Sequence, residues 1–258
     1  MSYECESRLE LKFRDNELVS SYCTAPFKVV RPFYKESGLV SLMVLSSSAG
    51  VMAGDNQFVD IVVDGLSVVE ITAQAYEKIH KMDKGSALRV STINVADGAT
   101  LIYKQAPVIP FASSAFKAST EVHLGTDARL IYSEILAAGR VFYGERFEYS
   151  FYESRTDVFV GSELVFVDNA YFEPRMMDMN GFGMYEGYTH LLTMVIVNVD
   201  ISADMVRDVV GDDVGVSETY YGDLCIKAFA FNAQRLEQIV ERVIDLTLQQ
   251  GGDLYESN

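Results

Sequence analysis

The stretch that decides the fold is residues 57–74, "QFVDIVVDGLSVVEITAQ". Its apolar residues Val59, Ile61 and Val63 recur at every second position, which places them on one face of an extended strand. Asp64 and Gly65 then predict a tight turn, and a second run rich in β-branched residues follows directly. The stretch therefore predicts two strands joined by a short turn.

The same pattern recurs along the chain. It appears in "ALRVSTINVADGATLIYK" (87–104), "TEVHLGTDARLIYSEIL" (120–136) and "FEYSFYESRTDVFVGSELVFVDN" (147–169). Strands rich in Val, Ile, Tyr, Phe and Thr, recurring about every 8–12 residues, indicate a mainly β fold. Periodicity alone leaves a sandwich, a barrel and a solenoid open, and the chain shows no sequence repeat of fixed length.

Helical patterns are concentrated near the C-terminus. Residues 231–252, "FNAQRLEQIVERVIDLTLQQGG", carry one apolar stripe, with Asn232 as the predicted N-cap and Gly251 as the predicted stop. A shorter helix is predicted to begin at Ser202. No Pro-rich or Gly/Ser-rich linker divides the chain, so a single domain spanning residues 1–258 is expected.

Charge and cysteine usage limit the classes of partner and compartment. The net charge of −16, from 37 acidic and 21 basic residues, repels nucleic acid and anionic membranes. Three widely spaced cysteines without a CxxC pair predict free thiols in a reducing compartment. The N-terminal residues lack an apolar signal segment, and the longest apolar run, 191–197, is too short for a membrane span. We expect a cytoplasmic protein that binds neither nucleic acid nor membranes.

The segment 46–57, "SSSAGVMAGDNQ", has three interpretations: a phosphate cradle, a catalytic loop around Asp55, or a corner between strands. No lysine follows the glycines, and a strand rather than a helix comes next, which excludes a phosphate cradle of the usual kind. Asp55 can cap a turn through its own backbone, or it can present a carboxylate to a cation. Both alternatives remain open at this stage.

A second glycine-marked corner lies in "YSEILAAGRVFYGERFEY", residues 132–149. Glu134 lies within an apolar strand, and Glu145 follows Arg140 at a bend. Carboxylates in such surroundings need partners to be tolerated. The two interpretations are a salt bridge that locks the strand corner, and a polar cavity lined by Glu134 or Glu145.

The segment 173–190, "EPRMMDMNGFGMYEGYTH", combines methionines with glycines. Methionine sulfur can bind soft metals, but flexible Met side chains also adapt to partner surfaces. The glycines favour a partner-docking segment. Its predicted contact residues are Met176, Met177, Met179, Met184 and Tyr185.

Motifs for several enzyme classes are absent from the sequence. It contains no nucleotide-hydrolysing loop, no G-x-S-x-G and no H-E-x-x-H. Its three histidines do not stand at metal-ligand spacing from one another or from a cysteine. We therefore expect no catalytic residues and no tightly bound cofactor.

Four motifs in order resemble the urease accessory protein family UreD, called UreH in helicobacters. "SSSAGVMAGD" resembles the family's S-P-G-G-x-x-x-G-D corner, although Ala49 stands where the family has a glycine. "ITAQAYEKIHKM" is similar to T-x-Q-x-x-x-K, "YKQAPVIPFASSAF" to P-x-x-I-P-F, and "SEILAAGRVFYGERF" to E-x-x-x-x-G-R-x-x-x-G-E. In the last three motifs the matching positions are Thr72, Gln74, Lys78, Pro107, Ile109, Pro110, Phe111, Glu134, Gly139, Arg140, Gly144 and Glu145. Their order and spacing hold over most of the chain.

The resemblance implies a non-enzymatic factor for urease maturation. Its implied partners are the urease structural subunits, UreF and the GTPase UreG, assembled as a dimer of accessory heterocomplexes that delivers nickel to urease. The implied fold is mainly β, a helical, β-helix-like stack of two β-sheets with short helices mostly near the C-terminus. Nucleotide hydrolysis would then belong to UreG.

The resemblance also implies transient passage of Ni²⁺ through the protein. Carboxylates and water hold Ni²⁺ weakly enough to release it. Asp55, Glu134 and Glu145 are the predicted residues of this path. Two other functions remain open on the residues alone: a β-sandwich that binds a ligand, and an acid/base hydrolase that uses Asp55 and Glu134.

Overall fold

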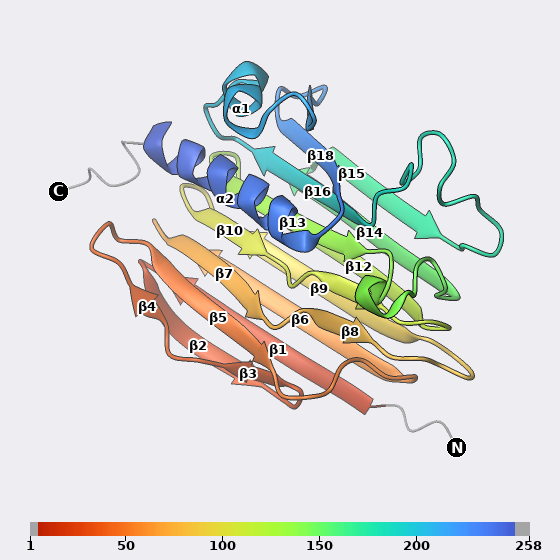
Figure 1. Ribbon diagram of the computed structural model, residues 1–258. Helices are drawn as coiled ribbons and strands as arrows, with labels where there is room; N and C mark the ends of the chain where they lie inside the picture. Colours follow the sequence, from red (N-terminus) through yellow and green to blue (C-terminus); the bar gives the residue numbers. More distant parts are fainter. Residues whose placement is uncertain (1–4, 251–258) are drawn as a thin grey trace.

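The computed structural model describes residues 5–250, and two stacked β-sheets form its body (Figure 1). In the seven-stranded sheet the order is β15-β14-β12-β9-β6-β1-β2. Its parallel strands are β1 (Cys5–Arg14), β6 (Asp55–Asp64), β9 (Ala87–Val95), β12 (Ala115–Leu124) and β14 (Phe151–Val160). Its antiparallel edge strands are β2 (Glu17–Cys23) and β15 (Glu163–Phe172).

The second sheet has eleven strands, in the order β17-β18-β16-β13-β10-β7-β5-β3 with three short strands beside this path. Its parallel centre consists of β5 (Val40–Ser46), β7 (Val68–Gln74), β10 (Thr100–Lys104) and β13 (Arg129–Ala137). The antiparallel strands are β3 (Phe27–Val29), β4 (Phe33–Tyr34), β16 (His190–Val197), β17 (Gly215–Glu218) and β18 (Leu224–Ala230). The short strands β8 (Glu77–Ile79) and β11 (Val108–Pro110) pair in parallel with each other.

The chain winds as a helical stack because it crosses repeatedly from the first sheet to the second and back. β6 lies in the first sheet and β7 in the second, and the same alternation holds for β9 and β10 and for β12 and β13. The turn at Asp64 and Gly65 therefore joins the sheets and does not close a hairpin. The mainly β, helical stack is confirmed, and the two strands on either side of this turn lie in different sheets. Each strand pairs with the equivalent strand of the next coil.

A large hydrophobic cluster packs between the two sheets, and a smaller one lies at one end of the strands. Parallel register puts equivalent residues side by side, so Leu11 lies beside Ile61, Ile61 beside Ile93, and Ile93 beside Val122. These four side chains are almost completely buried. Burial of each such side chain stabilises the fold by about 1.5–3 kcal/mol relative to exposure.

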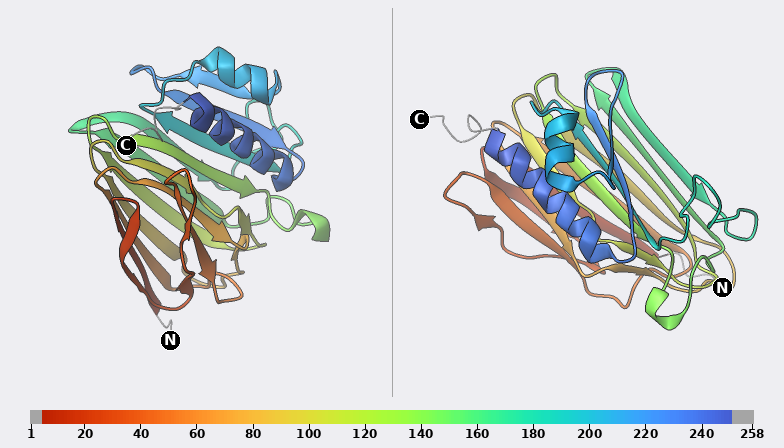
Figure 2. Two further views of the ribbon diagram at one scale, coloured as in Figure 1. Left: turned by 90° about the vertical axis from the view of Figure 1, so that its left-hand side faces the viewer. Right: turned by 45° about the horizontal axis from the view of Figure 1, so that its top comes forward.

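Two helices cover the outer face of the second sheet (Figure 2). In α1 (Ala203–Val210) the N-cap Ser202 accepts a 3.3 Å hydrogen bond from the backbone N–H of Met205. Before α2 (Ala233–Gln250) the side chain of Asn232 accepts from the N–H of Arg235 at 2.9 Å. The predicted N-cap Asn232 and the predicted helix start at Ser202 are confirmed, and the predicted stop at Gly251 lies outside the described residues. Neither helix in the described chain is long and apolar enough to cross a membrane.

Candidate functional site

The predicted corner 46–57 lies beside the short strands β8 and β11 of the second sheet. There Val51 forms an isolated parallel bridge with Ile79 of β8, and β8 in turn pairs with β11. The N–H of Val51 donates to the carbonyl of Lys78, and the N–H of His80 donates to the carbonyl of Val51, both at 2.8 Å. The corner therefore hydrogen-bonds through its backbone to the neighbouring coil of the stack.

Gly50 allows the backbone of the corner to approach the backbone of residues 78–80. Its φ is +146°, and a Cβ at this position would collide with the carbonyl oxygen of Lys78 and lie 2.8 Å from Cδ2 of His80. Only glycine fits such a close backbone contact without rearrangement. The glycine of the motif is thus explained by packing between coils.

Asp55 is the first residue of β6 and caps the corner. Its Oδ2 accepts a 2.8 Å hydrogen bond from the N–H of Met52, and its own N–H donates to the carbonyl of Met52 at 3.1 Å. This geometry matches the turn-capping interpretation of the sequence. One carboxylate oxygen is committed to the turn.

Glu134 projects between the two sheets. It lies on β13 two residues after Tyr132, on the same face of the strand. Its carboxylate accepts hydrogen bonds from Nε2 of Gln105 and from Oγ of Ser154, each at 3.3 Å, and from the hydroxyl of Tyr132. Burial raises the pKa of Glu134, although the hydrogen bond from Tyr132 opposes this effect. An interior carboxylate thus connects the two sheets.

A polar layer surrounds Glu134 at this end of the core. Arg89 Nε donates to Oε1 of Gln57 at 3.0 Å, and the guanidinium also pairs with Glu77. Arg89 and Gln105 line a cavity of about 130 Å³ that reaches the corner 46–51. Such a volume has room for several water molecules, and the polar side chains of Glu77, Arg89 and Gln105 in its otherwise mainly apolar wall can hydrogen-bond to them.

Glu145 lies at the surface after the 3₁₀ helix η1 (Val141–Tyr143). It accepts a 2.8 Å hydrogen bond from Nε of Arg140 and a 3.3 Å hydrogen bond from the N–H of Ala112. The hydrogen bond from Arg140 lowers the pKa of Glu145. A Cβ on Gly139 would lie 2.9 Å from the carbonyl oxygen of Glu145, so this corner also requires its glycine. The arrangement corresponds to the salt-bridge interpretation.

The three predicted carboxylates lie in separate surroundings. Asp55 caps a turn, Glu134 lies in the interior, and Glu145 pairs with Arg140. Across residues 5–250, no three His, Cys, Asp or Glu side chains gather closely enough to hold a metal ion. Asp55 and Glu134 share no hydrogen-bond partner, so the hydrolase alternative gains no support from the geometry.

A surface groove of about 720 Å³ brings all four of the sequence motifs together. We call it the α2–η1 groove, because the start of α2 and the residues of η1 form part of its wall. Its walls include the motif residues Lys78, Ile109, Phe111, Gly139 and Arg140, together with Ala49 from the corner 46–57. Motifs that are far apart in the sequence therefore meet at one surface site.

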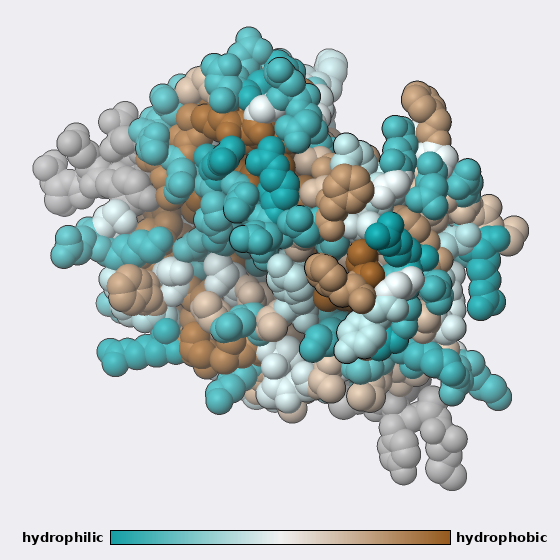
Figure 3. All heavy atoms as spheres, in the orientation of Figure 1, coloured by the Kyte–Doolittle hydropathy of each residue, from teal (hydrophilic) through white to brown (hydrophobic). Residues whose placement is uncertain are grey.

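The α2–η1 groove adjoins the polar cavity at the corner. Ala49, Tyr76 and Lys78 line both of them. On the face drawn in Figure 3, hydrophobic side chains emerge beside the N-terminal end of α2, next to hydrophilic ones. The candidate site thus combines an apolar surface groove with a polar interior.

The methionine segment is anchored rather than free along its whole length. Met179 and Tyr185 are buried, and the Tyr185 ring packs against Phe147 and Phe229 at centroid distances of 4.8 and 5.3 Å. Met176, in contrast, is 77% exposed. Partner contact through this segment stays a prediction. In this conformation Met179 and Tyr185 are buried and anchor the segment to the rest of the protein.

Sequence reasoning missed Arg89, Gln105 and Tyr132 as members of the polar interior. Tyr132 stands two residues before Glu134, so strand periodicity alone places both on one face. Arg89 lies in a run with strand character, where a buried cation requires a carboxylate partner. Its partner Glu77 could not be found from the sequence, because Glu77 lies on β8 of the second sheet and Arg89 on β9 of the first.

Comparisons with known proteins agree over nearly the whole chain. Residues 5–254 match the model of the UreD urease accessory protein family. The sequence is 38% identical over 250 residues to the urease accessory protein UreD of Acetivibrio thermocellus, covering 92% of this chain and 95% of the relative. It is 35% identical to the urease accessory protein UreH of Helicobacter pylori, covering 96% and 97%. The UreH protein of Helicobacter hepaticus is 34% identical, with 92% and 96% covered.

Proposed function

The chain belongs to the UreD family of urease accessory proteins, and we propose that it is a urease maturation factor. It binds apo-urease together with UreF and UreG and helps deliver nickel to the urease active site. The family match over residues 5–254 carries this proposal. The protein acts as a scaffold without catalytic residues, in the cytoplasm, and GTP hydrolysis belongs to UreG.

Nickel is cargo in this proposal, and the polar interior supports a route for it. Oxygen ligands and water bind Ni²⁺ weakly enough for transfer. Glu134 supplies such oxygens between the two sheets. Its hydrogen-bond partner Gln105 also lines the cavity beside Arg89, which has room for water. We assign Glu134 to the route itself. Asp55 guards the corner at which the cavity approaches the surface, and Glu145 orders the second corner through Arg140.

Partner contacts use the exposed apolar surface. Met176 and Phe182 of the segment 173–190 are 77% and 100% exposed. A segment that exposes large apolar side chains is a candidate for protein contact. We assign this segment and the C-terminal helix α2 to the contact with UreF.

Reconstituted activation of urease tests the proposed function. Purified apo-urease, UreF, UreG, GTP, bicarbonate and Ni²⁺ are combined with and without this protein, and urease activity and bound nickel are measured. Omission should abolish activation. Activation that proceeds equally well without the protein would overturn the maturation role.

Two carboxylate variants test the cargo route in the same system. Glu134→Gln keeps the shape of the interior but removes its ionisable group, whereas Glu163→Gln changes an exposed carboxylate on the edge strand β15. We expect Glu134→Gln to bind UreF normally and to slow nickel loading, and Glu163→Gln to behave as wild type. Full maturation by both Glu134→Gln and Asp55→Ala would remove these residues from the route.

A further inference from the structure

We propose that the α2–η1 groove binds a segment of a partner protein in which a carboxylate stands beside an aromatic or branched aliphatic side chain. The inference rests on the partner-binding part of the proposed function and does not depend on the nickel route. Four properties of the groove lead to this occupant: its volume, its apolar walls, the sign of its charged walls and the position of α2.

The volume and walls suit an apolar anchor. At about 720 Å³, the groove lies within the range of about 300–1,000 Å³ that is typical of ligand pockets. Ile109, Phe111 and Val141 contribute apolar walls. An aromatic or branched aliphatic side chain that fills such a pocket supplies most of the energy of a peptide contact.

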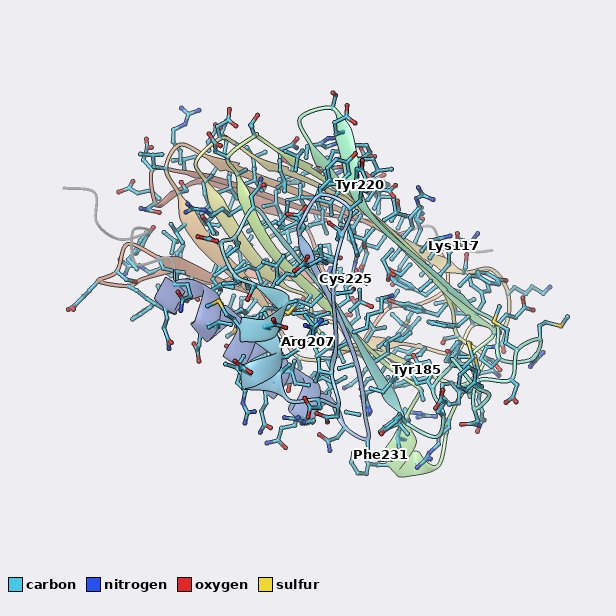
Figure 4. All side chains as sticks on the ribbon, turned by 90° about the horizontal axis from the view of Figure 1, so that it is seen from above. Lys117, Tyr185, Arg207, Tyr220, Cys225 and Phe231 are labelled. Atoms are coloured by element: carbon cyan, nitrogen blue, oxygen red, sulfur yellow. The ribbon has the colours of Figure 1, made fainter. Side chains whose placement is uncertain are left out.

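Large apolar side chains surround the groove and face solvent. Phe142 and Tyr143 of η1 are 97% and 83% exposed, and Phe231, directly before α2, is 64% exposed. Figure 4 shows Phe231 next to the coil of η1, away from the labelled Tyr220 and Lys117. Exposed aromatic side chains grouped around a pocket form the rim that a partner would cover.

The charged side chains of the groove wall are basic. Lys78 and Arg140 line it, and no carboxylate does so, in a chain whose net charge is −16. His190 also lines it, and burial lowers the pKa of His190 to about 4, so this ring is neutral at neutral pH. The two basic side chains therefore favour an anionic group on the occupant.

Arg140 is held in position for such a contact. Its guanidinium carbon lies 4.2 Å from the ring centroid of Phe111, and its Nε and Nη2 both donate to the carboxylate of Glu145. The side chain nevertheless keeps 36% of its surface exposed. A guanidinium has five N–H donors, so hydrogen bonds to a second carboxylate remain available.

The N-terminal end of α2 adds to the positive potential. Asn232, Ala233 and Gln234 line the groove, at the end of the helix where unpaired N–H groups concentrate positive partial charge. The carboxylate of the occupant is therefore expected between Arg140 and the first turn of α2. Its apolar neighbour would enter the pocket beside Phe111.

A peptide scan tests this inference on the full chain. Fluorescently labelled, overlapping 15-residue peptides that cover UreF, UreG and the urease subunits serve as probes, and fluorescence anisotropy measures their binding. We expect at least one bound peptide with an acidic residue within two positions of an aromatic or branched aliphatic residue. Replacing that acidic residue with its amide should weaken binding about tenfold, and added salt should weaken it as well.

Matched variants locate the binding. Phe142→Ser, Lys78→Gln and Arg140→Gln should each weaken binding about tenfold. Two control variants remove comparable side chains elsewhere: Tyr220→Ser, which is 95% exposed, and Lys117→Gln, whose ammonium lies over the Phe151 ring. Both controls should bind as wild type. Phe142→Ser removes a fully solvent-facing side chain, so the test does not depend on whether Arg140→Gln folds.

Three results would overturn the inference: no peptide binds, the groove variants bind as wild type, or binding requires removal of residues 251–258, which contain Asp253 and Tyr255. The last result would make the chain's own terminus the occupant. Omission of the protein from reconstituted urease activation remains a separate measurement. Failure of the proposed groove contact can therefore be distinguished from failure of the proposed maturation role.

Discussion

The corner motif requires glycine at position 50 because of its backbone conformation and its close contact with a neighbouring backbone. Replacement by alanine would combine an unfavourable φ with a collision against the carbonyl of Lys78. We expect Gly50→Ala to destabilise the protein by about 2–4 kcal/mol, measured by urea denaturation. Gly85→Ala is the control, because Gly85 has φ +76° but no atom near the new Cβ, and should cost about 1–2 kcal/mol. Equal losses would show that the close approach is unimportant.

Glu134 should give the protein a characteristic pH dependence. Burial raises its pKa in the folded state, so the folded state holds this proton more tightly than the unfolded state. The stabilisation is present below the ordinary pKa and is lost as the pH rises through the raised value. Stability of Glu134→Gln relative to wild type should therefore increase in denaturation curves as the pH rises above the ordinary glutamate pKa of 4.5, and should level off above the raised pKa. A difference that stays constant from pH 4.5 upward would contradict a raised pKa.

The sequence predicted that each carboxylate needs a partner, but it could not choose the partner. For Asp55 and Glu145 the local interpretation was available, because Met52 and Arg140 lie only three and five residues away along the chain. The partners of Glu134 include Gln105 on the preceding coil and Ser154 in the other sheet. Such contacts depend on the number of residues in each coil, which no single motif reveals.

At the scale of elements, one ion cluster fastens α2 to the second sheet. Lys104 of β10 lies 2.7 Å from Glu70 of β7 and 2.8 Å from Glu241 of α2. Burial opposes the charge of Glu70, but hydrogen bonds from Lys104 and Ser41 prevail and hold the pKa of Glu70 below its usual value. Lys104 is thus the shared partner of a strand and a helix.

Lys104→Met should leave the half-buried charge of Glu70 poorly paired and cost about 1–3 kcal/mol. The double variant Lys104→Met with Glu70→Gln should recover part of this loss, because the unpaired charge is gone. Thermal denaturation of both single variants and the double variant measures the coupling. Strictly additive effects would show that the two side chains do not depend on each other.

Tyr185 is expected to hold the methionine segment against the end of the sheets. Tyr185→Ala removes a buried ring that packs on Phe147 and Phe229, and should cost about 3–5 kcal/mol. It should also make the segment 173–190 more sensitive to limited proteolysis. Met176→Ala is the control, since this exposed side chain should change neither property. Unchanged cleavage of Tyr185→Ala would mean that other contacts hold the segment.

Helices and individual strands were predictable from local signals, whereas strand pairing was not. The caps Ser202 and Asn232 act within three residues, so the sequence contains the whole signal. The turn at Asp64 and Gly65 also marks a real corner, but the next strand lies in the other sheet. A short turn fits a hairpin and a sheet-to-sheet corner equally well. The residues of β6 alone cannot separate the two.

At the scale of the molecule, the interior changes character along the strands. Leu11, Ile61 and Ile93, which lie side by side in the first sheet, are apolar, while Ser7, Gln57 and Arg89, which lie side by side nearer the other end of the same strands, are polar. Apolar rows stabilise the stack, and polar rows can hold water and a cation in transit. The proposed nickel route therefore belongs to one end of the strands, the end that also carries the corner 46–57.

The central claim is that this protein matures urease, and activation of purified apo-urease by UreF, UreG, GTP and Ni²⁺ tests it most directly. The account predicts negligible urease activity and little bound nickel when the protein is omitted, and recovery of both when it is added back. Full activity and full nickel occupancy in its absence would contradict the account.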